Sequence, residues 1–297
     1  MELGRILTAM VTPFTADGAV DYAQARRLAL ALLDSGSDGL VVTGTTGEAP
    51  TLSTEEKVRL WGEVKDAVGD RGAVIAGSSD NCTADSIELC REAQRTGADA
   101  LLLSTPYYNK PPQEGLYRHF TAIAQAVDLP CIVYNIPGRT AVNIAVETQL
   151  RLAQVPNIIG VKESAGDLAQ TARIIEEAGP GYRLWTGDDA DTFHTLALGG
   201  YGVVSVATHF VGRQVAEMVQ GVLEGRTAEA AAIHRRLLPL IDALFVTTNP
   251  IPAKYALNGL GFHVGPLRLP LCEPDEATGE RIMAELRRHR IDLPLPV

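Results

Sequence analysis

The stretch Ile158-Ile159-Gly160-Val161-Lys162-Glu163-Ser164 is apolar and rich in β-branched residues, and it ends on a lysine rather than on a turn. Such a run predicts a buried strand, in which a fully hydrated side chain is out of place. Burial disfavours the charged ammonium and leaves a fraction of free amine that can attack a carbonyl. Lys162 is therefore a candidate Schiff-base nucleophile, although a lysine that extends its head from a strand end into water is the ordinary alternative. The other lysines are expected on polar helical faces, in a loop or beyond the last strand: Lys57, Lys65, Lys110 and Lys254.

Similar runs recur along the chain on either side of this stretch. Short apolar runs that alternate with stretches of 3.6-residue periodicity are typical of βα units in a parallel sheet. The repeat is about 28 residues long, which is the length that a strand, a helix and two short loops need. We expect eight strands, at residues 6–14, 39–44, 73–78, 100–105, 131–135, 158–164, 183–188 and 203–208.

Eight such units close into an α/β fold, the (β/α)8 TIM barrel. The main alternative, an open doubly wound sheet, would carry a Gly-x-Gly-x-x-Gly turn after the first strand, and the sequence has none there. Residues 1–224 are therefore expected to form one catalytic barrel. Residues 225–297 are expected to form an appended C-terminal helical segment that covers the barrel flank or makes a subunit interface. Polar residues follow nearly every strand, at the end of the barrel where active sites are built.

Composition limits the kinds of partner. The formal net charge is -10 and no cluster of Lys and Arg occurs, which argues against nucleic acid or an anionic membrane and favours a small molecule. The four cysteines lack Cys-x-x-Cys spacing and the six histidines lack His-x-His or His-Glu-x-x-His spacing, so no metal site is expected. Scattered free cysteines and the absence of a signal-peptide pattern predict a cytoplasmic protein.

Three strand ends carry residues suited to chemistry. The turn Gly44-Thr45-Thr46-Gly47-Glu48 offers backbone N–H groups and hydroxyls to a carboxylate. Strand five ends on Tyr134, whose phenol needs a hydrogen-bonded neighbour, such as Thr45, to move protons at neutral pH. Arg139 follows in a Pro-Gly turn and has a planar fork that suits a carboxylate, and the Pro-bounded pair Tyr107-Tyr108 is placed to reach a site or a neighbouring subunit. Taken singly, each feature is more typical of ordinary packing or of a solvated loop.

Together, five motifs resemble the pyruvate-dependent aldolase and N-acetylneuraminate lyase superfamily, and within it the dihydrodipicolinate synthases. They are GTTGE at 44–48, PYYNKP at 106–111, YNIPGRT at 134–140, GVKES at 160–164 and GDD at 187–189. The resemblance extends into the tail at residues 248–252 and 265–270. It implies condensation of pyruvate with L-aspartate 4-semialdehyde in lysine and diaminopimelate biosynthesis, with no cofactor beyond the covalent imine of Lys162 with pyruvate.

The resemblance also implies roles for single residues. Thr45 and Thr46 would hold the carboxylate of pyruvate, and Arg139 that of the semialdehyde. Tyr134, Thr45 and Tyr108 match a proton-relay triad in which the last tyrosine comes from a neighbouring subunit of a homotetramer built as a dimer of dimers. The remaining matches are two backbone positions that line the pocket: Gly187 and Val204.

An effector cleft is a further expectation from the resemblance. In feedback-inhibited members, lysine binds at a dimer interface near the position of Tyr107, and Asn81 and Asp85 are compatible with such a cleft. Thr54 and Lys57 stand where those members carry histidines. Because Lys57 would repel a cationic effector, we expect weak or absent inhibition by lysine.

Two alternatives stay open on the sequence. A sister aldolase or lyase acting on sialic acid or on a 2-keto-3-deoxy sugar acid would share the lysine and the tyrosine, but it would need hydroxyl-binding groups. A non-catalytic barrel that binds a small acid as a sensor or scaffold would not need the full set of reactive side chains. Trapping of a pyruvate adduct on Lys162 with borohydride distinguishes an enzyme of this class from a sensor.

Overall fold

The computed structural model describes residues 3–295, which form a closed barrel of eight parallel strands in sequence order. Each strand pairs in parallel with its sequence neighbours, and β8 returns to pair with β1. The strands are β1 Ile6–Ala9, β2 Gly39–Val42, β3 Ala73–Gly77, β4 Ala100–Ser104, β5 Cys131–Asn135, β6 Ile158–Glu163, β7 Arg183–Thr186 and β8 Gly202–Ser205. The TIM barrel expected from the sequence is therefore confirmed.

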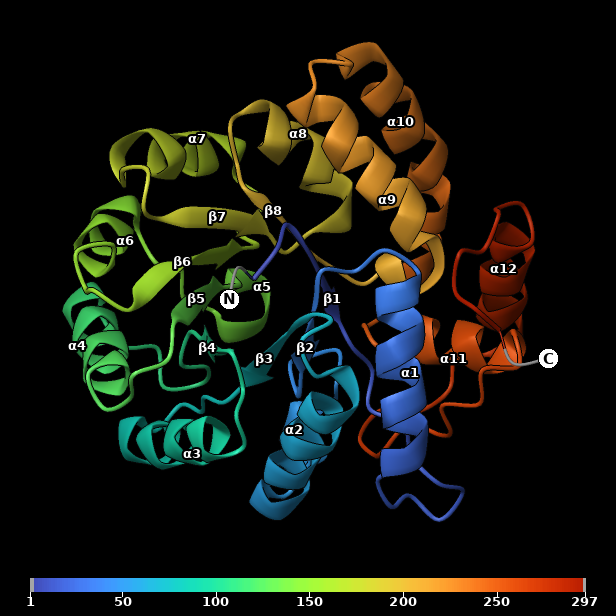
Figure 1. The fold of residues 1–297 in the computed structure, drawn as a ribbon, viewed down its shortest axis with the longest axis horizontal. Coiled ribbons are helices and arrows are strands. Elements are labelled where there is room, and N and C mark those ends of the chain that lie inside the picture. Colours follow the sequence, from blue (N-terminus) through green and yellow to red (C-terminus); the bar gives the residue numbers. More distant parts are fainter. Residues whose placement is uncertain (1–2, 296–297) are drawn as a thin grey trace.

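Helices surround the barrel and also form the C-terminal part of the chain (Figure 1). Around the barrel lie α1 Tyr22–Asp34, α2 Thr54–Val68, α3 Thr83–Arg95, α4 Gln113–Ala124, α5 Pro137–Thr140, α6 Val146–Leu152, α7 Leu168–Glu177, α8 Thr192–Ala197 and α9 Thr208–Leu223, with short 3-10 turns at Ala49–Thr51 and Asp189–Asp191. The tail contains α10 Thr227–Leu244, α11 Ile251–Gly259 and α12 Glu276–Leu286. Among the helices of residues 3–295, none combines the length and the apolar character that a membrane crossing requires.

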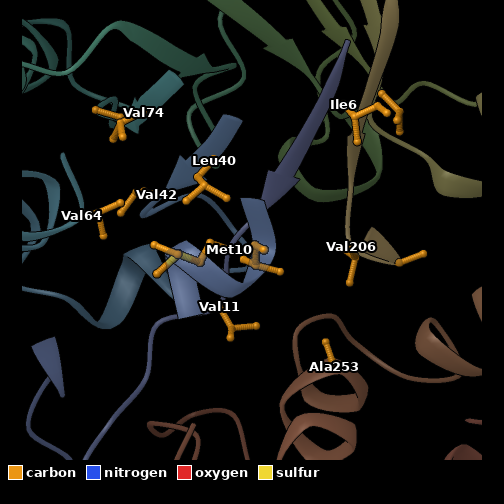
Figure 2. Close-up of a cluster of buried hydrophobic side chains, with 14 of the residues drawn as sticks. Ile6, Met10, Val11, Leu40, Val42, Val64, Val74, Val206 and Ala253 are labelled. Carbon is orange, nitrogen blue, oxygen red and sulfur yellow. The ribbon is translucent and has the colours of Figure 1, made fainter. Parts of the chain in front are cut away.

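Each strand is buried on both faces, because one face lines the barrel interior and the other packs against helices. The interior cluster includes Leu7, Val41, Ile75, Tyr134 and Val204. The outer cluster is larger, and Figure 2 shows part of it, with Ile6, Leu40, Val42 and Val74 from the strands, Val64 from α2 and Ala253 from α11. The tail helix α11 thus shares the core that lies between the strands and the helices.

The start of α2 carries a clear local signal. Ser53 caps α2, its side chain accepts the Glu56 N–H, and the Glu56 carboxylate accepts the Ser53 N–H, a reciprocal capping box. Seven of the eight strands end before the predicted runs do, and the difference is largest for β1, by five residues, and β8, by three. After β1, the Val11 N–H donates to His209 Nε2 instead of to a strand. After β8, the N–H groups of Val206 and Ala207 donate to Asp189. A segment whose backbone N–H groups donate to side chains cannot also donate them to a neighbouring strand, so the strand ends there.

The tail is fastened to the barrel by a buried ion pair. Lys254 of α11 lies 2.8 Å from Glu48, which follows β2, and the two side chains are 1% and 0% exposed. A second ion pair joins the tail to α2, because Arg268 Nη2 lies 2.6 Å from Glu56 Oε1. The predicted division of the chain at residue 224 stays a prediction, although residues on the two sides of that point share contacts.

Candidate active site

Lys162 lies near the C-terminal end of β6 and faces the barrel interior. It is opposite Tyr134 of β5 in the register of the two strands, and its Nζ lies 4.0 Å from the centroid of the Tyr134 ring. Only 6% of the side chain is exposed, and no residue in 3–295 makes a hydrogen bond to Nζ. An amine at the end of a barrel strand that makes no hydrogen bond within residues 3–295 is available to a carbonyl compound.

Gly187, directly after β7, leaves the space that the lysine stem occupies. A Cβ on Gly187 would lie 2.6 Å from Lys162 Cε and 2.1 Å from Ser164 Oγ, closer than real atoms approach. Val204 of β8 is buried in the same interior cluster as Tyr134. The structure therefore brings Gly187 to Lys162, and it places Val204 on the same inner wall.

A buried carboxylate behind the barrel wall holds β5 and β6 in register. Glu163 points away from Lys162 toward the helices and accepts hydrogen bonds from Asn135 Nδ2 at 2.9 Å, Gln149 Nε2 at 2.9 Å and the Ala165 N–H at 2.9 Å. Burial raises the pKa of the Glu163 carboxyl, and these donors oppose the rise. Because Asn135 follows Tyr134 and Glu163 follows Lys162, this network fixes the two interior side chains relative to each other.

A second lysine is buried more deeply than Lys162, which sequence position alone did not indicate. Lys254 Nζ donates to Glu48 Oε1 at 2.8 Å and to the carbonyl oxygens of Thr12 at 3.1 Å and Pro266 at 2.6 Å. Desolvation lowers the pKa of Lys254, and Glu48 opposes that change. All three donor positions of its ammonium are used, so Lys254 has a structural role. Burial alone therefore does not identify a nucleophile, whereas burial without a hydrogen-bond partner distinguishes Lys162.

The threonine turn after β2 is buried and tied to the tail. Thr46 is 3% exposed, Thr45 is half-buried, and Glu48 has a positive φ of 55° that closes the turn. Thr46 Oγ1 accepts a hydrogen bond of 2.9 Å from Asn249 Nδ2. The hydroxyl of Thr46 is thus held by a residue 203 positions later in the chain.

Arg139 lies on the one-turn helix α5, and its guanidinium is exposed. Its Nη2 donates to the carbonyl oxygen of Asn249 at 3.2 Å. Asn249 therefore contacts both groups that the sequence suggests for binding carboxylates, the threonine turn and Arg139. The exposed remainder of the guanidinium fork is free to receive an anion.

The three residues expected to form a proton relay do not meet within one chain. No hydrogen bond joins the Tyr134 hydroxyl to Thr45 or to any other described residue, so the expected hydrogen bond between Tyr134 and Thr45 is absent from residues 3–295. Tyr108 has a positive φ of 72° and its side chain is 90% exposed. An outward tyrosine on a strained loop cannot close a relay in its own barrel, because its hydroxyl is in solvent.

The expected effector residues adjoin a surface groove between α2 and α3. The groove has a volume of about 780 Å³, and Asp85, Asp80 and Lys57 are among its lining residues. The Tyr107 hydroxyl donates to Asp80 at 2.8 Å, and burial together with this bond raises the pKa of Tyr107 to about 12. Asn81 Nδ2 donates to the Tyr107 carbonyl at 3.1 Å. Desolvation lowers the pKa of Lys57, and the nearby Asp80 opposes that change.

Sequence reasoning assigned no role to Asn249 or Asp189. Asn249 lies in the tail motif at 248–252, which was noticed only as part of a resemblance. Asp189 accepts the N–H groups of Val206 at 2.9 Å and Ala207 at 3.3 Å, together with the Ser205 hydroxyl, and so joins the ends of β7 and β8. Burial raises its pKa from 3.8 to about 6. The available signal was an acid directly after a strand in the GDD motif.

Comparisons with known proteins agree with this arrangement. The model of the dihydrodipicolinate synthetase family matches residues 2–289. The 4-hydroxy-tetrahydrodipicolinate synthase of Dehalococcoides mccartyi is 58% identical over 99% of both chains, and that of Symbiobacterium thermophilum is 59% identical over 94% of this chain and 95% of the relative. The crystal structure of the Cyanidioschyzon merolae enzyme with lysine bound superposes with a TM-score of 0.95 at 46% identity, covering 96% of this chain and 97% of the other. With a family model that matches nearly the whole chain, a matching barrel and relatives similar over nearly their whole length, the chain belongs to the dihydrodipicolinate synthetase family.

Proposed function

We propose that this protein is a 4-hydroxy-tetrahydrodipicolinate synthase, a lyase that condenses pyruvate with L-aspartate 4-semialdehyde. The observation that carries the proposal is the amine of Lys162, buried at the barrel mouth over the Tyr134 ring without a hydrogen-bond partner among residues 3–295. The names of the relatives support the substrate pair. The reaction belongs to lysine and diaminopimelate biosynthesis, and we infer a cytoplasmic setting for it.

The chemistry needs no bound cofactor. The free amine of Lys162 attacks the keto carbon of pyruvate and releases water to give an imine. Loss of a proton from the methyl carbon gives an enamine, whose carbon attacks the aldehyde of the semialdehyde; the aldehyde oxygen takes up a proton and becomes a hydroxyl. The amino group of the second substrate then displaces the Lys162 amine and closes the ring. Covalent attachment lets the protonated imine accept the electrons of the carbanion.

The two carboxylates of the substrates need fixed donors. We assign the pyruvate carboxylate to Thr45 and Thr46, supported by the buried turn that holds them. We assign the semialdehyde carboxylate to Arg139, whose exposed fork suits a carboxylate. Backbone groups at Gly187 and Val204 would line the pocket between them. Fixing both anions turns a reaction between two dilute anions into one between positioned groups.

Proton transfer is assigned to Tyr134, Thr45 and a Tyr108 from a second copy. Exposure of 90% at Tyr108 supports the last assignment, because an outward aromatic on a short loop is available to a neighbouring subunit. We propose a homotetramer built from two such dimers. The relay would then form only on assembly, which predicts that activity falls when the dimer dissociates on dilution.

Trapping with pyruvate and borohydride tests the proposal. Reduction of the imine should add the mass of one reduced pyruvate per chain, and peptide mapping should place it on Lys162. Lys162→Ala should gain no mass and retain the wild-type unfolding midpoint, while Lys57→Met, which removes a half-buried lysine amine in the groove between α2 and α3, is the control and should still gain the mass. A mass gain that survives in Lys162→Ala would refute the assignment.

The second substrate is tested separately. Wild-type protein with pyruvate and L-aspartate 4-semialdehyde should form the cyclic product, whereas pyruvate with a sugar aldehyde or N-acetylmannosamine should give no condensation. The exposed fork of Arg139 favours a second small anion over a polyhydroxylated aldehyde. Product formation from the sugar aldehyde at a comparable rate would reassign the chain to a sister activity.

A further inference from the structure

Asn249 connects the C-terminal segment to the threonine turn at the barrel mouth. Its side-chain Nδ2 lies 2.9 Å from Thr46 Oγ1, and its backbone oxygen accepts Arg139 Nη2 at 3.2 Å. The residue is 7% exposed. No other residue in 3–295 contacts both of these groups by a hydrogen bond.

We propose that Asn249 is a positioning residue that aims the Thr46 hydroxyl hydrogen at the pyruvate carboxylate. This inference rests on the proposed function, and it adds a residue of the tail to the binding of the first substrate. The physical basis is the direction of a single hydrogen bond.

A threonine hydroxyl carries one hydrogen and two acceptor lone pairs. When Nδ2 of Asn249 donates to Oγ1, one lone pair is occupied and the hydroxyl hydrogen must point elsewhere. Thr46 is buried, so water does not compete for that hydrogen. The amide thus removes one of the three staggered positions of the hydroxyl hydrogen and leaves the two that point away from Asn249. A donor held in this way suits an anion, because a carboxylate only accepts hydrogen bonds.

Two further contacts hold the amide and the turn in place. Glu48, two residues after Thr46, accepts Lys254 Nζ at 2.8 Å and the Arg268 N–H at 2.9 Å. Both partners belong to the tail, and Lys254 lies on α11, which begins two residues after Asn249. The tail is therefore hydrogen-bonded to the turn at Glu48 as well as at Thr46, so separate contacts hold Asn249 beside Thr46.

The decisive variant is Asn249→Asp, which keeps the size of the side chain and reverses the hydrogen bond. A carboxylate would accept the Thr46 hydroxyl hydrogen and remove it from the substrate. The pyruvate concentration for half-maximal borohydride trapping should then rise about tenfold or more, the factor expected for losing one hydrogen bond to a charged group. Asn249→Ala removes the donor without adding charge, and it should raise that concentration only by a factor of about 1.5, since the hydroxyl hydrogen regains the one position that the amide had excluded.

Asn258→Asp is the matched control. Asn258 lies on α11, the helix that follows Asn249, and donates Nδ2 to the Gly265 carbonyl at 2.9 Å, so this change also costs one hydrogen bond in the tail. It touches neither Thr46 nor Arg139 and should leave the pyruvate dependence of trapping unchanged. A rise in Asn258→Asp equal to that in Asn249→Asp would show that general loosening of the tail is responsible and would overturn the proposal.

A double-mutant cycle with Thr46→Val keeps the proposal testable even if Asn249→Asp does not fold. If Asn249 acts through the hydroxyl, Asn249→Ala should have no further effect on half-maximal pyruvate in the Thr46→Val background. An equal rise for Asn249→Ala in both backgrounds would overturn the inference. So would an Asn249→Asp variant that traps at the wild-type pyruvate concentration, which is the result for the opposite amide orientation. Failure of the wild type to trap pyruvate at all would instead overturn the proposed function.

Discussion

Replacing Lys254 with methionine should destabilise the protein strongly, although the residue lies outside the barrel strands. The substitution removes the ammonium that lies 2.8 Å from Glu48 and leaves a carboxylate that is 0% exposed. Removing one partner of a buried ion pair costs about 3–5 kcal/mol, because the other charge stays desolvated. The carbonyl oxygens of Thr12 and Pro266 also lose a donor, so we expect the upper half of that range.

Urea unfolding followed by tryptophan fluorescence measures this loss. Trp61 and Trp185 are both 0% exposed, so their emission reports unfolding on the α2 side and inside the barrel. The double variant Glu48→Gln with Lys254→Met removes both charges, and it should regain most of the lost free energy of unfolding. Arg118→Met serves as a control, because the Arg118 side chain is 77% exposed, and its midpoint should equal that of the wild type.

Two results would refute this reasoning. A loss below about 1 kcal/mol for Lys254→Met would mean that Glu48 is hydrated or protonated once its partner is gone. A double variant no more stable than Lys254→Met would mean that lost packing of the lysine stem, rather than the unpaired carboxylate, dominates the effect.

Four further predictions concern the site and its surroundings. Gly187→Ala should abolish pyruvate trapping, because the new Cβ would lie 2.6 Å from Lys162 Cε; normal trapping would show that the stem of this lysine moves aside freely. Arg139→Ala should raise the semialdehyde concentration for half-maximal rate about tenfold in steady-state kinetics. A rise for pyruvate instead would contradict the role assigned to Arg139. Asp189 has a pKa raised from 3.8 to about 6, so the folded state binds the proton more tightly than the unfolded state and the protein loses stability as pH rises through this range. The free energy of unfolding of Asp189→Asn should not fall over this range, so relative to that of the wild type it should rise by up to about 3 kcal/mol between pH 4 and 7, as measured by urea unfolding. If the difference in free energy between the two proteins stays constant with pH, Asp189 does not become a buried charge. L-Lysine should inhibit weakly or not at all, and more strongly in Lys57→Ala, because the ammonium of Lys57 lies in the same groove as the acids; micromolar inhibition of the wild type would refute this.

The sequence by itself determined the barrel and its nucleophile candidate. Apolar β-branched runs report burial on both faces of a strand, and their regular spacing reports βα units. The helix start at Ser53 was readable because a capping box is local. Lys162 was identifiable because a charged residue inside such a run conflicts with its surroundings. These signals all arise from neighbouring residues, for which periodicity and propensity are sufficient.

Only the tertiary structure decided which distant groups meet. The hydrogen bond from Asn249 to Thr46 spans 203 residues, and the ion pair of Lys254 with Glu48 spans 206. Local pattern cannot predict such contacts, because it records how a segment is buried and not which segment buries it. The outward position of Tyr108 was undetermined for the same reason: an aromatic on a loop has the same sequence whether it packs inward or faces a partner. Closure of the chain into the barrel brings the tail against the turn after β2, so these long-range contacts exist only in the folded protein.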